Sequence, residues 1–331
     1  MSRLGLAVPF SNPLPFADHL KLAREAEARG YDVAWTAEVG GPDAVTTMSL
    51  LATNTTRLRI ATGIIPVQTR TPIVLGMTAA TLGTLAPGRI ALGLGVSSRI
   101  IVGQWHGLPF TRPLAQLREA VTIIRMVLAG ERVNFEGEFY RLKNFRLLTP
   151  PPPQPVPIYL GALGPRMLQL AGEIADGVLL NWIPPEAIPE SIKQIEIGAR
   201  RAGRSLDNFE IACFIRVSVT DDPEPARRWL ARDITGYCIV DSYARFFTAS
   251  GFGAEVEAVK RAWHAGDRAG AVAQISPRFL DGLGVVGSED VCRHRLRDFA
   301  KAGLTQTVVF PFAADPAPFP ILLRTVQAFP A

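Results

Sequence analysis

Short apolar runs rich in β-branched residues alternate with longer amphipathic segments along the chain. Leu4–Val8 is short and apolar, which predicts a strand. Phe16–Arg29 carries apolar residues at helical spacing with charges between them, and Gly30 follows it as a helix-ending residue would. This segment is therefore predicted to be a helix, and the same alternation recurs to the end of the chain.

Eight strands are predicted in this way, each followed by at least one helix. They are Leu4–Val8, Asp32–Ala37, Leu58–Ile65, Arg89–Leu94, Ile158–Leu160, Gly177–Leu180, Phe209–Val219 and Thr307–Phe310. The pattern is typical of an α/β protein with a closed (β/α)8 TIM barrel, and we expect one such domain over residues 1–331. An open doubly wound sheet is the alternative, although it more often has about five to seven strands.

Two insertions interrupt this alternation. Val96–Arg112 follows the fourth strand, and a longer insertion follows the seventh, with helices predicted at Pro223–Thr248, Ala254–Ala265, Ala269–Gln274 and Glu289–Ala302. Val133–Phe145 alternates with a period of two around Gly137 and predicts a hairpin. The six prolines of Pro150–Pro157 favour a stiff approach to the fifth strand, with a linker between two domains as the alternative.

The charge balance is mildly basic, with 35 Lys and Arg against 30 Asp and Glu. No run of five basic residues occurs, so no nucleic-acid partner is expected, whereas an anionic small molecule would suit the excess. Three widely spaced cysteines indicate reduced thiols in a cytoplasmic protein. The apolar stretch between Arg70 and Arg89 contains prolines and many threonines, so we expect a buried helix, no membrane span and no signal peptide.

In a (β/α)8 barrel, functional residues lie on the loops that follow the strands. Glu38 ends the second strand and could act in proton transfer, with a capping or solvated charge as the alternative. Gly63, between Thr62 and Ile64 at the end of the third strand, indicates either unusual backbone geometry or close packing. The fourth strand is followed by residues that could offer N–H and hydroxyl donors, namely Val96, Ser97 and Ser98.

The turn after the fifth strand combines glycines with a proline that opens a helix. Backbone N–H groups and the positive end of the helix would face the strand end, which suits a phosphate. A tight turn without a ligand is the alternative. The turn comprises Gly161, Ala162, Leu163, Gly164, Pro165 and Arg166. After the sixth strand, Asn181 could bind the edge of a ring or tie down its loop.

Motifs for other chemistries are missing from the sequence. Its four histidines show no paired spacing, and neither HExxH nor GxSxG occurs, so no metal site and no serine-hydrolase site is expected. His106 lies in the first insertion, where we favour a structural role over one at the barrel mouth.

Five segments together resemble the bacterial-luciferase-like oxidoreductases, in particular the branch that uses coenzyme F420 and includes methylenetetrahydromethanopterin reductase. The resemblance covers essentially the whole chain. The segments are AREAEARGYDVAW over Ala23–Trp35, RIATGIIPVQTRTP over Arg59–Pro72, GRIALGLG over Gly88–Gly95, WHGLPFTRP over Trp105–Pro113, and YLGALGPRMLQLAGEIADG over Tyr159–Gly177.

This resemblance implies a non-prolyl cis peptide bond between Gly63 and Ile64, forming a bulge behind the deazaflavin ring. It also implies a phosphate site at Gly161 to Met167 and ring contacts at Glu38, at Thr62 to Ile64, and at Val96 to Ser98. The family commonly pairs through helices near the second and third strands. A homodimer is therefore expected, with Met48–Leu51 and Val74–Leu85 supplying much of its surface.

The sequence also departs from the family pattern. Val39 and Val96 stand where several F420 enzymes carry His and Glu, which leaves Glu38 as the main candidate for proton handling. We expect an F420-dependent oxidoreductase that transfers a hydride between the deazaflavin C5 and a small organic substrate. An FMN-dependent monooxygenase is the alternative, and a barrel that binds a cofactor without turnover stays open. The substrate would be selected by Val96–Arg112 and Ser242–Leu283.

Overall fold

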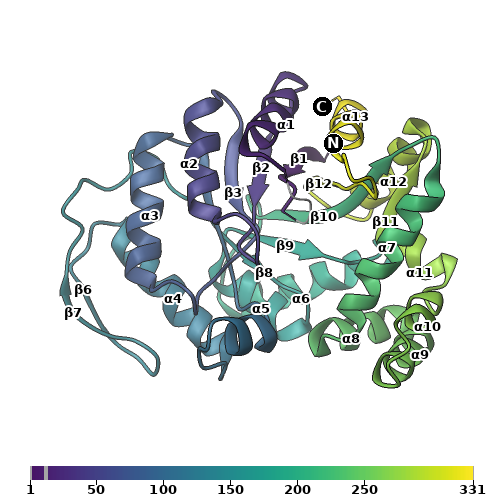
Figure 1. Ribbon diagram of the computed structural model, residues 1–331. Coiled ribbons are helices and arrows are strands. Elements are labelled where there is room, and N and C mark those ends of the chain that lie inside the picture. The colour runs from purple at the N-terminus through teal and green to yellow at the C-terminus, as the bar shows by residue number, and fades with distance from the viewer. Residues whose placement is uncertain (1, 11–13, 331) are drawn as a thin grey trace.

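The computed structural model describes residues 2–10 and 14–330, and within them eight parallel strands close into a barrel (Figure 1). Each strand pairs with the next, and the last pairs with β1 to complete the ring. The predicted (β/α)8 barrel is therefore confirmed. Its strands are β1 (Arg3–Ala7), β2 (Val33–Thr36), β3 (Arg59–Thr62), β5 (Ile90–Gly95), β8 (Ile158–Gly161), β9 (Gly177–Asn181), β10 (Glu210–Val219) and β12 (Gln306–Pro311).

Helices surround the barrel and begin where the sequence signals them. Asp43 caps α2 by accepting a hydrogen bond from the Thr46 N–H at 2.7 Å, and prolines occupy the first turns of α3, α4 and α5. No helix in the described part of the chain is long and apolar enough to cross a membrane. The surrounding helices are α1 (Phe16–Ala28), α2 (Ala44–Asn54), α3 (Pro72–Leu85), α4 (Pro113–Leu128), α5 (Pro165–Ile174), α6 (Ile188–Arg201) and α13 (Phe319–Gln327).

The third predicted strand, Leu58–Ile65, is interrupted. β3 ends at Thr62, a cis peptide bond joins Gly63 to Ile64, and β4 (Ile65–Pro66) then pairs with β5. The prediction of one continuous strand was wrong, because the chain changes direction at this bond. The cis bond that the family resemblance implied is present.

The first insertion follows β5, and the hairpin follows α4. After β5 the chain forms a π-helix, η1 (Ile100–Trp105). After α4 the predicted hairpin is present as β6 (Val133–Glu136) and β7 (Arg141–Phe145), which project as an arm beside α3 and α4 (Figure 1). The proline-rich segment leads directly into β8, and the short helix η2 (Pro185–Ala187) follows β9.

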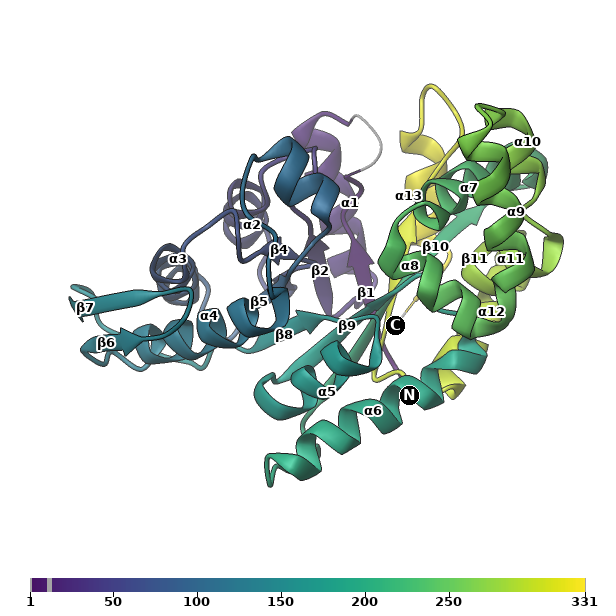
Figure 2. The same cartoon turned by 90° about the horizontal axis from the view of Figure 1, so that it is seen from below.

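The insertion after β10 lies on the opposite side of the barrel from this arm (Figure 2). It packs around its own apolar cluster, which includes Leu230, Phe247 and Phe279. Its elements are α7 (Pro223–Cys238), α8 (Asp241–Phe247), η3 (Thr248–Phe252), α9 (Gly253–His264), α10 (Arg268–Ala273), α11 (Pro277–Leu283), β11 (Gly284–Gly287) and α12 (Glu289–Lys301).

Two predictions for this insertion were wrong. The helix expected over Pro223–Thr248 is divided between α7 and α8, because Val240 has an extended backbone with φ −90° and ψ 116°. The sequence analysis also missed α11 and β11. β11 extends the sheet beside β10, where Gly284 is the register partner of Arg216, beyond the end of β9.

A group of charged side chains closes the N-terminal end of the barrel. Arg59 donates hydrogen bonds to Asp32 and to both carboxylate oxygens of Glu210, at 3.0 Å each for Glu210. Gln306 joins this group by donating to Asp32 and by accepting the indole N–H of Trp35 at 2.9 Å. Burial alone would raise the pKa of Glu210, but the hydrogen bonds from Arg59 outweigh it and lower that pKa.

We predict that Arg59→Met lowers the free energy of unfolding at pH 7 by about 2–4 kcal/mol, because two partly buried carboxylates lose the more buried of their two arginine partners and keep only Arg3. The lowered pKa of Glu210 contributes stability that is present above its ordinary value of 4.5 and is lost as the pH falls through its folded value. The deficit of the variant should therefore shrink between pH 7 and pH 4. Urea unfolding at both pH values measures this effect.

Arg141→Met is the matched control, because Arg141 pairs with Glu136 on the exposed hairpin and its loss should cost under about 0.5 kcal/mol. Equal losses for the two variants at pH 7 would contradict the role given to Arg59.

Candidate active site

The Gly63–Ile64 bond lies at the C-terminal mouth of the barrel, and glycines from two neighbouring strands, β5 and β8, lie against Ile64. A Cβ atom on Gly63 would come within 2.5 Å of Phe214 Cζ and 2.7 Å of Leu179 Cδ2. A Cβ atom on Gly95 or on Gly161 would approach atoms of Ile64 to 2.7 Å and 3.0 Å. Glycine at these positions therefore lets the Ile64 side chain lie between β5 and β8.

Of the residues predicted to contact a ligand near this bond, Thr62 and Ser98 already form hydrogen bonds within the protein. The Thr62 hydroxyl donates to the Gly93 carbonyl at 2.7 Å and accepts the Gly93 N–H at 2.8 Å, so this buried hydroxyl already serves the sheet. Ser98 accepts the Ile101 N–H and so helps to begin η1. Ser97 has a left-handed backbone, with φ 55°, and is half-buried beside Val96.

The turn from Gly161 to Met167 leads into the start of α5, as expected. Gly164 occupies the cap position, and nothing lies within 4 Å of where its Cβ would stand. Arg166 is exposed and has neither a hydrogen bond nor an ion pair with any residue the structure describes, whereas Met167 is buried. An open helix N-terminus next to an unpaired arginine suits an anionic group.

Glu38 is placed at the end of β2, where Arg70 holds it. Its carboxylate accepts hydrogen bonds from Arg70 Nη2 at 2.9 Å and from Nε at 3.2 Å, and Thr69 adds a longer one. Arg70 also pairs with Asp43, the cap of α2. Burial would raise the pKa of Asp43, but its bonds to the helix start and to Arg70 outweigh it and lower that pKa. The sequence did not reveal Arg70 as the partner of Glu38.

Asn181 belongs to a buried polar group at the ends of β9 and β10. Its amide oxygen accepts a hydrogen bond from Arg216, and its amide nitrogen donates to the Tyr243 hydroxyl at 2.9 Å. The next residue, Trp182, has a left-handed backbone with φ 53°, which is rare for a bulky side chain. Asn181 therefore does more than tie down its own loop. The inward period-two position of Arg216 along its strand was the signal that could have singled out this arginine.

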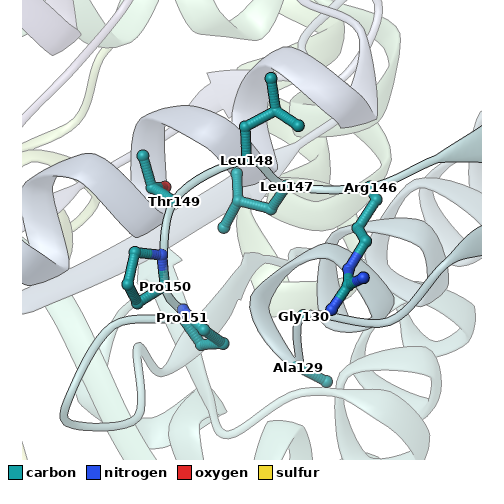
Figure 3. A pocket seen from close by; sticks show the side chains of 8 residues that line it. All are labelled: Ala129, Gly130, Arg146, Leu147, Leu148, Thr149, Pro150 and Pro151. Atoms are coloured by element: carbon teal, nitrogen blue, oxygen red, sulfur yellow. The ribbon is translucent and has the colours of Figure 1, made fainter.

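One surface hollow lies at the other end of the barrel. It has a volume of about 490 Å³ and lies between the end of α4 and the segment after β7, lined by Ala129, Gly130, Arg146, Leu147, Leu148, Thr149, Pro150 and Pro151 (Figure 3). α4 runs antiparallel to the strands, so its C-terminal end marks the N-terminal face of the barrel. Chemistry in this fold occurs at the opposite face. Among the described residues, no three His, Cys, Asp or Glu side chains could together hold a metal ion.

Comparison with known proteins agrees with this geometry. The model of the luciferase-like monooxygenase family matches residues 3–306. A Mycobacterium tuberculosis protein named as a coenzyme F420-dependent oxidoreductase is 33% identical over 95% of this chain and 96% of its own. The 5,10-methylenetetrahydromethanopterin reductase of Archaeoglobus fulgidus is 29% identical over 86% of each chain.

A solved structure with the same fold is the coenzyme F420-dependent tetrahydromethanopterin reductase from Methanopyrus kandleri. It superposes with a TM-score of 0.85 at 25% identity, covering 99% of this chain and 98% of its own. The family model alone spans more than half of the sequence. This chain therefore belongs to the luciferase-like monooxygenase family and is an oxidoreductase.

Proposed function

We propose that the protein is an F420-dependent oxidoreductase acting on a small organic substrate. The observation that carries this proposal is the mouth in which Gly95 and Gly161 accommodate the Ile64 side chain, together with the open start of α5 at Gly164. The named relatives of similar length, two of which carry F420 in their names, support the choice of cofactor. Coenzyme F420, when bound, supplies or accepts the hydride at C5 of its deazaflavin.

Each part of the mouth would hold a different part of this cofactor. Ile64, with the backbone of Gly63 and Val96 to Ser98, would support the ring system. The N–H groups at the start of α5 and the unpaired Arg166 would bind the anionic tail. Glu38 would hold or accept a proton at its carboxylate, and Arg70 would position it. Three buried, unpaired cysteines support a reducing cytoplasm as its location, which fractionation of the source cells would check.

A second candidate function is that of an FMN-dependent monooxygenase. The description of the family model favours it, because that model covers monooxygenases with the same barrel. FMN carries one phosphate on a short chain, so it would use fewer of the anion-binding groups at α5 than the longer tail of F420.

The cofactor is tested by titrating the purified protein with F420 and with FMN at low salt and following fluorescence quenching. We expect F420 to bind at least about 10-fold more tightly than FMN. Arg166→Met should weaken F420 binding about 3- to 10-fold through loss of a charge-assisted contact. Arg200→Met removes the same charge from the exposed end of α6 and should leave F420 affinity unchanged. Tighter binding of FMN would instead select the monooxygenase.

The role of Glu38 is tested with Glu38→Gln in turnover assays with reduced F420 and unsaturated or carbonyl substrates. The amide oxygen of Gln can still accept a hydrogen bond from Arg70 but the group cannot carry a proton, so turnover should fall about 100-fold, far more than the affinity for F420. Asp43→Asn is the control, because it removes the other acid beside Arg70 while keeping a good helix cap. Full turnover in Glu38→Gln would refute the assignment.

We further propose a homodimer that buries the outer face of α3. The expected contribution of Met48–Leu51 was wrong, because Met48 and Leu51 are fully buried in the core of the subunit. No charged residue occurs between Arg70 and Arg89, and Val74, Met77 and Leu85 expose between 44% and 51% of their surface. Apolar side chains gathered on one helix in this way are typical of a protein interface.

Light scattering at micromolar concentration should give a dimer for the natural protein and a monomer for Met77→Glu, because a buried unpaired charge would oppose association. Ile197→Glu is the matched control, since Ile197 is an exposed apolar residue on α6 at 38% exposure, away from this face. A monomeric natural protein would contradict the proposal.

A further inference from the structure

Arg216 is a buried cation inside the barrel mouth. It lies on β10 two residues beyond Phe214, the ring that Gly63 approaches, and consecutive inward positions on a strand are about 7 Å apart. Arg216 is therefore one layer nearer the mouth than the Gly63–Ile64 bond. Only 2% of its surface is exposed.

This guanidinium has too few partners for its charge. Its single hydrogen bond among the described residues goes to Asn181, a neutral acceptor, and no described carboxylate lies within the 4.0 Å of an ion pair. The rings of Trp182 and Phe310 flank it, with centroids 3.9 Å and 4.5 Å from its central carbon. Flanking rings stabilise a guanidinium but do not satisfy its N–H groups.

Asp233 of α7 is an acid whose pKa responds to the charge of Arg216. Burial raises the pKa of Asp233, and the charge of Arg216 lowers it by a smaller amount. No ion pair within 4.0 Å joins these two described side chains, so Asp233 is not the direct partner that the guanidinium lacks.

Three buried groups in this region have no hydrogen-bond partner among the described residues. They are Arg216 Nε, the Trp182 indole nitrogen and the hydroxyl of Ser218, which is the next inward residue on β10. All three can donate a hydrogen bond. Buried donors without partners are costly, and a set of donors beside an uncompensated cation matches a ligand that only accepts.

We propose that Arg216 is the substrate-binding cation of this enzyme and takes a carboxylate carried on a flat apolar skeleton. The guanidinium supplies a planar pair of donors for the carboxylate, while Trp182 and Phe310 provide apolar surface for the attached carbons. The ligand would reach Arg216 past Asn181, which is only half-buried. The inference deepens the proposed function by naming its substrate class, but carboxylate binding itself does not require F420.

The test compares cinnamate, a flat unsaturated acid, with its neutral amide, cinnamamide, by calorimetry on the purified full-length protein. The natural protein should bind cinnamate at least about 10-fold more tightly than cinnamamide. Arg216→Met should reduce this preference below about 3-fold. Arg228→Met is the control, because Arg228 is an exposed arginine on α7 and its loss should leave the preference intact.

A second variant guards against misfolding of Arg216→Met. Asn181→Asp places a carboxylate on the existing partner of Arg216 without changing the side-chain shape. This variant should melt at a higher temperature than the natural protein, because the buried cation gains a counterion, and should lose the preference for cinnamate. An arginine with a purely structural role would gain stability in the same variant, but it would give no carboxylate preference to lose.

Equal binding of acid and amide by the natural protein, or no binding of the acid at about 10 mM, would overturn the proposal. A preference that survives in both Arg216→Met and Asn181→Asp would overturn it as well. The F420 titration is an independent readout. If F420 fails to bind while the Arg216-dependent preference holds, the proposed function is lost and the carboxylate site stands.

Discussion

The bridge from Arg59 to Asp32 and Glu210 is the interaction on which the closed barrel depends. Arg59 begins β3, Asp32 immediately precedes the neighbouring strand β2, and Glu210 begins β10, which is not adjacent to either strand. Because the Arg59 guanidinium is largely buried, it needs carboxylates at hydrogen-bonding distance. Its ion pairs therefore hold the starts of these strands together. The lumen is thereby filled at its N-terminal end. At the other end, glycines in β5 and β8 make space for the side chain of Ile64.

The barrel holds a second buried arginine, Arg216, which has no carboxylate paired with it in the described part of the chain. Arg59 meets two carboxylates, and its own pKa is raised by them although burial alone would lower it. Arg216 is more deeply buried and meets one amide oxygen. Folding can tolerate a site of this kind when other interactions over-determine the surrounding structure, and here the stack of Trp182 and Phe310 does so. The same residue type therefore stabilises the fold at one end and is left available for a ligand at the other.

The spacing of apolar residues, with glycine and proline at the ends of elements, predicted the positions of all eight strands and most helices. It could do so because burial on one or both faces controls which residues each element can carry. The break at Gly63 could not be read from periodicity, since it depends on how Ile64 fits against β5 and β8. β11 is short and begins with glycine, and it forms only because β9 ends before β10. Glu38 was placed after a strand from the sequence, but its pairing with Arg70 joins residues 32 positions apart and could not be predicted. Arg216 was not singled out, because its burial depends on closure of the ring.

The stack at Arg216 also joins two hydrophobic cores that are otherwise separate. Phe310 belongs to the cluster inside the barrel, and Trp182 belongs to the cluster of the insertion after β10. The guanidinium contacts both rings, so a ligand that displaced Arg216 would disturb the packing of both clusters. Tyr243 of the insertion holds Asn181 and so fixes the remaining side of the group. Tyr237 of α7 packs against Trp182, and Tyr243 of α8 bonds Asn181, so a change in either helix would reach the mouth without altering the barrel strands.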